Sequence, residues 1–233
     1  MPLSVEGRER FDSTVIFTID GAGAKDLDDA VSLRKLKNGW QLGVHIADVT
    51  HYVRPGSVVD EEARQRGTSV YLVDRTVPML PEKLCNKLCS LRPNEEKLTF
   101  SAVFELTPLG KVADRWYGKT VIYSDQRFSY EEAQAIIEAG PKASHEGVSE
   151  PVKEAVLVLH NLASKLRKKR FAAGAISFER PEMKVVVDEK GRPVDVYQKV
   201  SVEANWLIEE FMLLANRSVA EFVARKCKGK TFV

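Results

Sequence analysis

The spacing of the apolar residues changes once along the chain, near Ser129, and this change limits the folds that the chain can adopt. From Thr14 to about Tyr123, short apolar runs alternate with turn residues, a pattern that is typical of β-strands. After Ser129 the apolar residues recur at helical spacing. The sequence therefore predicts an α+β fold, in which a mixed, mostly antiparallel sheet is followed by long amphipathic helices.

The strand-rich half contains two predicted hairpins on either side of a long loop. The first hairpin turns at Asn38-Gly39, because Asn-Gly is a strong hairpin signal, and the second turns at 108–110. The segment between them, 51–93, contains a short predicted helix at 59–66 and is otherwise irregular, and a loop of this length is usually functional. We expect strands at 15–19, 30–33, 40–46, 97–106 and 112–122.

The helical half begins with a capping box formed by Ser129 and Glu132. At the other end of the chain, 231–233 has the composition of an apolar strand that has just begun. We therefore interpret 1–233 as one partial domain, truncated at its C-terminus. We expect helices after Ser129, at 151–173 and at 202–227, and strands at 175–178, 183–188 and 194–200.

Composition excludes several classes of protein. No apolar run approaches the ~20 residues of a membrane span, and residues 1–4 do not resemble a secretory signal. Three cysteines cannot form a disulfide framework, so a reducing cytoplasm is the expected location. The 35 basic and 33 acidic residues nearly cancel, so any nucleic-acid site must come from local patterning. The sequence does not indicate an oligomeric state.

Four aspartates fall within ten residues, between two apolar strands and beside two glycines: Asp20, Asp26, Asp28 and Asp29. Carboxylates together with waters and phosphate oxygens are the ligands of Mg²⁺. Four converging carboxylates could hold two such ions for phosphodiester cleavage. The alternative is a solvated turn, in which the aspartates cap backbone amides. An EF-hand is excluded, because the loop lacks its glycine and its final glutamate.

The order of motifs resembles the ribonuclease II/ribonuclease R family, whose catalytic unit is the RNB domain, and within it bacterial ribonuclease R. The resemblance covers nearly the whole chain and corresponds to the N-terminal part of that domain. Residues 21–23 depart from the Pro-Glu or similar residues that the family often has there. The matching strings are TIDGAGAKDLDDA (18–30), GVHIADVTHYV (43–53), RGTSVYL (66–72), VPMLP (77–81), LCSL (88–91) and LIEEFMLLAN (207–216).

The resemblance implies a hydrolytic exoribonuclease that works from the single-stranded 3′ end of RNA and releases 5′-nucleoside monophosphates. The four aspartates would be catalytic and would bind Mg²⁺, with Mn²⁺ as a substitute, and loss of Asp28 would abolish cleavage but not RNA binding. Tyr71 would stack near the terminal nucleotide. Tyr130 and Glu210 would form the pair that prefers ribose to deoxyribose.

The resemblance also implies two differences from a complete enzyme. The family supplies a catalytic arginine from a Ser-Pro-x-Arg-Arg-Tyr-like segment, and this string does not occur in the sequence. Its cold-shock and S1 modules are likewise not in this chain. We therefore expect weak metal binding, self-association and slow catalysis.

Other features have competing interpretations. The basic run at 165–170, including Lys168 and Arg170, is either a contact to RNA phosphates or a solvated helix face. His45, Cys85 and Cys89 are interpreted as core residues rather than ligands. Two alternatives to the nuclease stay open: a non-catalytic RNA-binding fragment or pseudoenzyme of the same fold, and a module stabilised by Ca²⁺ or Mg²⁺ without a nucleic-acid role.

Overall fold

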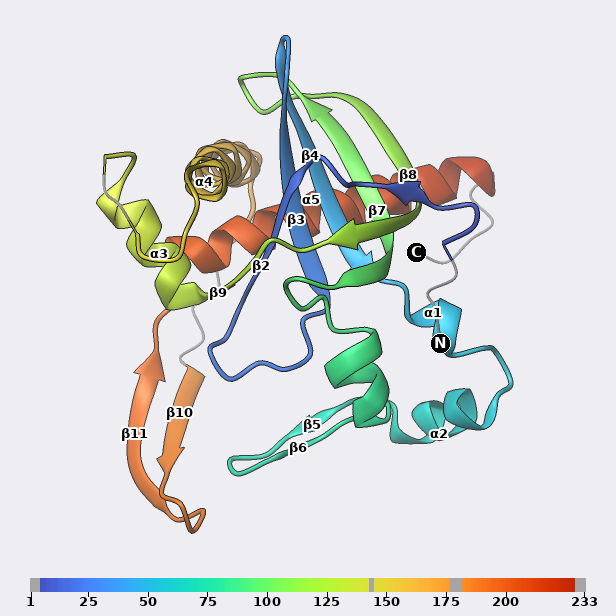
Figure 1. Ribbon diagram of the computed structural model, residues 1–233, viewed down its shortest axis with the longest axis vertical. Coiled ribbons are helices and arrows are strands. Elements are labelled where there is room, and N and C mark those ends of the chain that lie inside the picture. The colour runs from blue at the N-terminus through green and yellow to red at the C-terminus, as the bar shows by residue number, and fades with distance from the viewer. Residues whose placement is uncertain (1–4, 143–144, 177–181, 229–233) are drawn as a thin grey trace.

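The computed structural model describes residues 5–142, 145–176 and 182–228. A seven-stranded sheet forms its centre, with the strand order β1-β8-β7-β4-β3-β2-β9 (Figure 1). The elements are β1 (Glu9–Arg10), β2 (Val15–Asp20), β3 (Asp29–Leu36), β4 (Gly39–Ala47), α1 (Val49–Tyr52), α2 (Val58–Arg66), β5 (Val70–Tyr71), β6 (Thr76–Val77), the π-helix η1 (Leu84–Leu88), β7 (Glu96–Leu106), β8 (Val112–Tyr123), β9 (Gln126–Ser129), α3 (Tyr130–Ala139), α4 (Glu150–Ala172), β10 (Glu182–Val187), β11 (Pro193–Lys199) and α5 (Glu203–Lys226).

The predicted α+β class and both predicted hairpins are confirmed. Strands β3 and β4 pair antiparallel from Asp29↔Ile46 to Leu36↔Gly39, and β7 pairs antiparallel with β4 and β8. Gly39 has a φ of 137°, and an added Cβ would collide with the carbonyl oxygen of Leu106. The turn therefore requires glycine for both its conformation and its close approach to β7.

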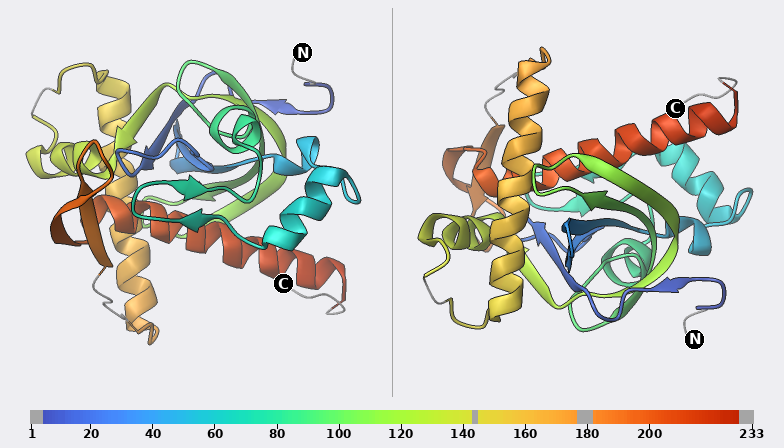
Figure 2. Two further views of the ribbon diagram at one scale, coloured as in Figure 1. Left: turned by 90° about the horizontal axis from the view of Figure 1, so that it is seen from below. Right: turned by 90° about the horizontal axis from the view of Figure 1, so that it is seen from above.

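Three helices cover one face of the sheet. Helices α4 and α5 cross over this face, and α3 lies beside them (Figure 2). Their apolar sides pack against β2, β3, β4 and β7, so that Phe17, Phe104, Leu159 and Phe211 are completely buried in one core. The predicted capping box is present, because Ser129 and Glu132 exchange hydrogen bonds at the start of α3.

The opposite face of the sheet carries a smaller core and a buried polar network. Cys89 and Leu91 pack there against the sheet, which confirms Cys89 as a core residue. His45 is completely buried, with Nδ1 2.6 Å from Ser101 Oγ and Nε2 2.8 Å from Ser32 Oγ. This burial and these two partners confirm the prediction of a satisfied core histidine, and burial lowers the pKa of His45 to about 3.

The segment predicted to be largely irregular is more ordered than expected. It contains α2, which begins after the N-cap Ser57 and ends at Gly67, and also the small β5–β6 hairpin and η1. Two-residue strands are too short to show periodicity in a sequence. Cys85 lies on η1 and is only half-buried, which differs from the core position expected for it. The β10–β11 hairpin forms a separate two-stranded sheet.

Two sequence predictions fall partly or wholly beyond the described ranges. Of the strand predicted at 175–178, Ala175 and Ile176 are not in a strand and the other two residues lie outside the described part of the chain. The apolar strand start at 231–233 also lies outside it. Among the described helices, none has the length and apolar character needed to cross a bilayer.

Candidate active site

The four aspartates lie at one end of the β2–β3 pair. Asp20 is the last residue of β2 and Asp29 is the first residue of β3, and these two strands are antiparallel neighbours. Asp26 and Asp28 lie in the connection between them, 21–28, which we call the carboxylate loop. This strand pair therefore brings both ends of the motif to the same end of the sheet, where the carboxylate loop connects β2 to β3 (Figure 1).

Buried contacts around Leu27 fix the second half of the carboxylate loop. Leu27 is 2% exposed, and its N–H donates to Ser90 Oγ at 3.2 Å. The same Ser90 hydroxyl donates to the carbonyl oxygen of Lys25 at 2.8 Å, and the N–H of Leu91 donates to the carbonyl of Leu27 at 2.8 Å. Because Leu27 faces the interior, its neighbours Asp26 and Asp28 are directed away from it.

Arg127 fixes the first half of the same loop. It lies on β9, which pairs parallel with β2. Its Nη2 donates to the carbonyl oxygens of Gly21 at 3.3 Å, Ala22 at 2.8 Å and Ala24 at 3.0 Å. The sequence analysis missed this residue, because a single arginine on a strand distant in sequence has no local motif that connects it to the loop.

The carboxylates destabilise one another's charged forms. Burial, followed by the charges of Asp29, Asp26 and Asp28, raises the pKa of Asp20 to about 7, and Arg127 only partly opposes this shift. Burial and the charge of Asp28 raise the pKa of Asp29 to about 6. Reduced hydration and the charge of Asp26 raise the pKa of Asp28. Ionising these carboxylates together is therefore unfavourable unless a cation offsets their charge.

The donor set fits a hard cation, but it is not a closed cage. Across 5–142, 145–176 and 182–228, no three His, Cys, Asp or Glu side chains converge closely enough to enclose a metal ion. Mg²⁺ does not require such a cage, since it is commonly held by one or two carboxylates together with waters and substrate phosphates. The oxygen-only donors, and the cost of ionising them together, are consistent with that mode of binding.

Two tyrosines lie next to the carboxylates. The hydroxyl of Tyr71, on β5, lies 3.2 Å from Asp26 Oδ2, while its side chain stays exposed. Tyr130 is the first residue of α3 and interacts with the side chain of Asn205. Burial and the charges of Asp20 and Asp29 raise the pKa of Tyr130 to about 12, so this phenol remains protonated at neutral pH.

The other predicted RNA-binding residues lie on α4 and α5. Glu210 is 3% exposed, and Arg170 donates to it from Nε at 3.0 Å and from Nη2 at 2.5 Å. Arg170 also contacts Glu209 at 2.9 Å, and Arg167 stacks on Trp206 with its Cζ 4.5 Å from the ring centre. Glu210 and Arg170 therefore form an ion pair with each other. Lys168 is exposed.

Comparison with known proteins identifies the family of this chain. The RNB domain model matches residues 8–233, which is most of the chain. The chain belongs to the RNB domain family. DIS3-like exonuclease 2 of Schizosaccharomyces pombe is 47% identical over 98% of this chain and 26% of its own length. Ribonuclease R 1 of Lactococcus lactis is 44% identical over 93% of this chain and 26% of its own length.

The solved structures support the same fold for this RNB chain. RNase R of Mycoplasma genitalium in complex with ribose-methylated single-stranded RNA has a TM-score of 0.86 at 32% identity, over 95% of this chain and 34% of that one. The chain spans about a quarter of the length of the curated relatives. Relatives also include an inactive exonuclease DIS3L2 of Arabidopsis thaliana, 37% identical over 98% of this chain and 23% of its own length. Membership of the family therefore does not by itself establish activity.

Proposed function

We propose that this chain is the carboxylate-bearing part of a 3′-to-5′ hydrolytic exoribonuclease that depends on Mg²⁺ and releases 5′-nucleoside monophosphates. The observation that carries the proposal is the placement of Asp20 at the end of β2, Asp29 at the start of β3, and Asp26 and Asp28 in the loop between them, in a chain of the RNB domain family. Carboxylates beside an exposed aromatic residue suit a site where a cation and a nucleic-acid phosphate meet.

Asp20, Asp26, Asp28 and Asp29 would hold the metal. When bound, Mg²⁺ supplies an activated water and neutralises charge on the departing 3′ oxygen. The protein's own contribution is positional: Arg127 and Ser90 fix the backbone of the carboxylate loop at its two halves.

The two tyrosines would orient the end of the RNA. Tyr71 presents an exposed ring beside Asp26, and base–aromatic stacking contributes about 1–3 kcal/mol per base. Tyr130 would offer a protonated hydroxyl close to Asp20, where it could donate to an oxygen of the terminal nucleotide.

Catalysis by this chain alone should be slow. Within the described ranges, Arg127 is the cation that opposes the pKa rise of Asp20, and its Nη2 is committed to three loop carbonyls. A cationic side chain on the transferring phosphate can contribute 10³–10⁵ in rate in other phosphoryl-transfer enzymes. We therefore propose turnover lower than that of a complete enzyme by about 10³ or more.

The test is single-turnover digestion of a 5′-labelled single-stranded RNA by excess protein in Mg²⁺. We expect shortening from the 3′ end with release of 5′-monophosphates, and loss of that activity in Asp28→Asn. Asp114→Asn is the matched control, because Asp114 is an exposed aspartate on β8. RNA binding without any release of nucleotides would instead favour a non-catalytic RNA-binding member of the family.

A further inference from the structure

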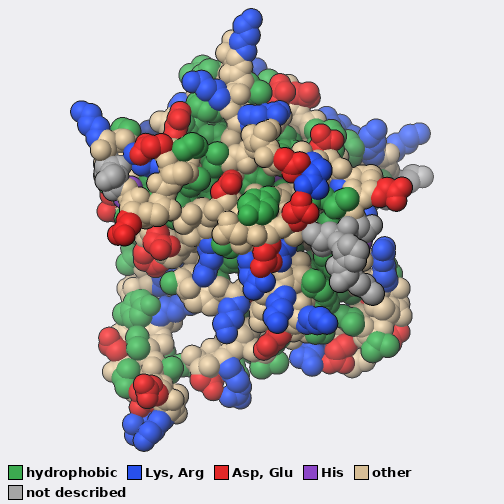
Figure 3. Space-filling view, viewed as in Figure 1, with side chains coloured by type: hydrophobic (Ala, Val, Ile, Leu, Met, Phe, Trp, Pro, Cys, Tyr) green, Lys and Arg blue, Asp and Glu red, His purple; other side chains and the backbone are tan. Residues whose placement is uncertain are grey.

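A second cavity lies behind the carboxylate loop. Its volume is about 680 Å³, and residues from the loop, from the segment around η1 and from β9 line it. In the view of Figure 3, Lys and Arg side chains gather over the segment that contains η1 and beside the loop. The charged residues that line the cavity are Lys25, Lys83, Lys87, Arg92 and Arg127, with Glu82 as the one acid among them.

The cavity is separate from the carboxylate cluster. Lys25 and Leu27 line it, whereas Asp26 and Asp28, which alternate with them along the loop, do not. Leu27 is buried whereas its neighbour Asp28 is exposed, so the two side chains have different surroundings. The carboxylate loop therefore contributes Asp26 and Asp28 to the cluster but Lys25 and Leu27 to the cationic cavity.

The cations of this cavity are only partly paired, since Arg92 Nη2 contacts Glu95 Oε1 at 2.6 Å and Arg127 Nη2 donates to three loop carbonyls. Among the described residues, the ammonium groups of Lys25, Lys83 and Lys87 have no hydrogen bond or ion pair. The buried Nε atoms of Arg92 and Arg127 also have no acceptor. A buried N–H without an acceptor destabilises the protein, so the two arginine Nε atoms, beside three exposed lysines without a partner, favour an anion.

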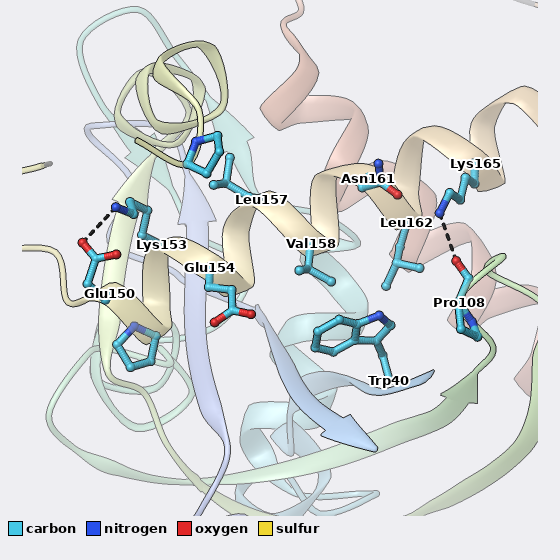
Figure 4. A pocket seen from close by; sticks show the side chains of 12 residues that line it. Trp40, Pro108, Glu150, Lys153, Glu154, Leu157, Val158, Asn161, Leu162 and Lys165 are labelled. Atoms are coloured by element: carbon cyan, nitrogen blue, oxygen red, sulfur yellow. Dashed lines mark hydrogen bonds and ion pairs between the residues drawn. The ribbon is translucent and has the colours of Figure 1, made fainter. Parts of the chain in front are cut away.

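In the other large cavity, by contrast, the lysines have partners. It measures about 650 Å³ and lies between α4 and Trp40 (Figure 4). Its lysines are paired, because Lys153 contacts Glu150 at 2.8 Å and Lys165 donates to the carbonyl oxygen of Pro108 at 2.9 Å. Unpaired cations are therefore not a general property of the cavities in this protein.

We propose that the cationic cavity binds the phosphate group of a nucleoside monophosphate. The arginine and lysine side chains would bind the phosphate oxygens, and Leu27 and Pro93 supply an apolar wall for a base. The volume lies within the range of small-molecule sites, about 300–1,000 Å³, and exceeds what a bare phosphate needs. The choice of a nucleotide rests on the proposed function, of which it is the product, whereas the anion site rests on the cavity alone.

The experiment is calorimetric titration of the chain with adenosine 5′-monophosphate in EDTA, so that metal at the carboxylates makes no contribution. The variant Lys83→Ala/Lys87→Ala changes two exposed cations of the cavity, and Lys37→Ala/Lys142→Ala is the charge-matched control at two exposed lysines elsewhere. We expect at least tenfold weaker binding in the first variant and less than a twofold change in the control. Adenosine, which lacks the phosphate, should not bind.

The outcomes separate this proposal from the proposed function. Equal weakening in both double variants, or binding of adenosine as tight as that of its monophosphate, would overturn the phosphate site. Binding of inorganic phosphate as tight as the nucleotide would overturn the nucleotide as its ligand. RNA digestion in Mg²⁺ is measured independently, so metal-free nucleotide binding by a chain that digests no RNA would retain this site while removing the nuclease function.

Discussion

The hydroxyl of Tyr71 lies 3.2 Å from Oδ2 of Asp26, although the Tyr71 side chain is 69% exposed. This contact joins the β5–β6 hairpin to the carboxylate loop, two segments that β3, β4 and α2 separate in the sequence. It holds an aromatic ring beside the carboxylates while leaving the ring accessible to a nucleic-acid base.

Replacing Tyr71 should distinguish its ring from its hydroxyl. In Tyr71→Ala we expect the shortest digestion product to become longer, because stacking matters most when few other nucleotides are bound. Tyr71→Phe keeps the ring and should keep the wild-type end product. The measurement is the product length from a series of short oligoribonucleotides, and identical end products for the two variants would contradict a stacking role.

Asp20 should make stability fall as the pH rises. Its pKa is raised in the folded state to about 7 from 3.8, so the folded protein binds its proton more tightly than the unfolded chain does. The penalty for ionising it is absent below pH 4, grows between pH 4 and 7, and is complete above pH 7. We expect Asp20→Asn to flatten this dependence and to raise the Tm at pH 8, measured in EDTA by thermal unfolding, whereas Asp114→Asn should follow the wild type.

Binding of Mg²⁺ should offset part of the destabilisation that ionised Asp20 causes above pH 7. A ligand that binds only the folded state stabilises it by about 2.7 kcal/mol at 100 times its Kd. We therefore expect Mg²⁺ to raise the Tm of the wild-type protein at pH 8, and EDTA to reverse the change. Because the carboxylates would be the ligands, Asp20→Asn and Asp28→Asn should respond less. A Tm that rises equally in all three proteins would indicate that the metal binds elsewhere.

Although its side chain is small, Ser90 should contribute measurably to the stability of the protein, because it holds the carboxylate loop. Its hydroxyl bonds to the N–H of Leu27 and to the carbonyl of Lys25, and the residue is completely buried. Ser90→Ala would leave the N–H of Leu27 without its acceptor, at a cost of about 1–3 kcal/mol in the free energy of unfolding. The measurement is urea unfolding, with Ser218→Ala on α5 as the control, because Ser218 is also buried but has no contact to the loop.

Glu210→Ala tests a contribution to stability, whereas Lys168→Ala tests a contribution to RNA binding. Glu210→Ala removes a buried, charge-assisted hydrogen-bond partner of Arg170 at a cost of about 1–3 kcal/mol, since Arg170 is partly exposed and keeps Glu209. The variant should therefore unfold at a lower urea concentration. Lys168 is exposed, so Lys168→Ala should leave stability unchanged and, if it contacts phosphate, should reduce the salt dependence of RNA affinity. An unchanged salt slope would favour the solvated helix face.

Local patterns predicted most of the fold. The Asn-Gly turn, the capping box at Ser129 and the apolar spacing in α4 and α5 act between near neighbours, so the sequence carries them directly. The hairpin β5–β6 was missed because its strands have two residues each and an exposed surface. Without alternation or burial, such strands have no periodic signature.

The carboxylates of the candidate site are visible in the sequence, but the residues that support their loop are not. The four aspartates occupy one short stretch, and in the structure Asp20 ends β2 and Asp29 begins β3, with Asp26 and Asp28 in the connection. Arg127 and Ser90 reach the loop across the sheet, and only tertiary structure shows which backbone groups they meet. The pairing of Glu210 with Arg170 was missed for the same reason, since it depends on how α4 crosses α5.

The parallel pairing of β2 with β9 has a consequence for the order of folding. Asp125, just before β9, accepts a hydrogen bond from the N–H of Ile16, a contact between residues 109 positions apart. Closing so large a loop costs entropy before any contact repays it. The hairpins β3–β4 and β7–β8 should therefore form first, and the carboxylate loop should acquire its Arg127 contacts last. On a ribosome, the growing chain would thus have no Arg127-supported carboxylate loop until residue 127 had left the exit tunnel.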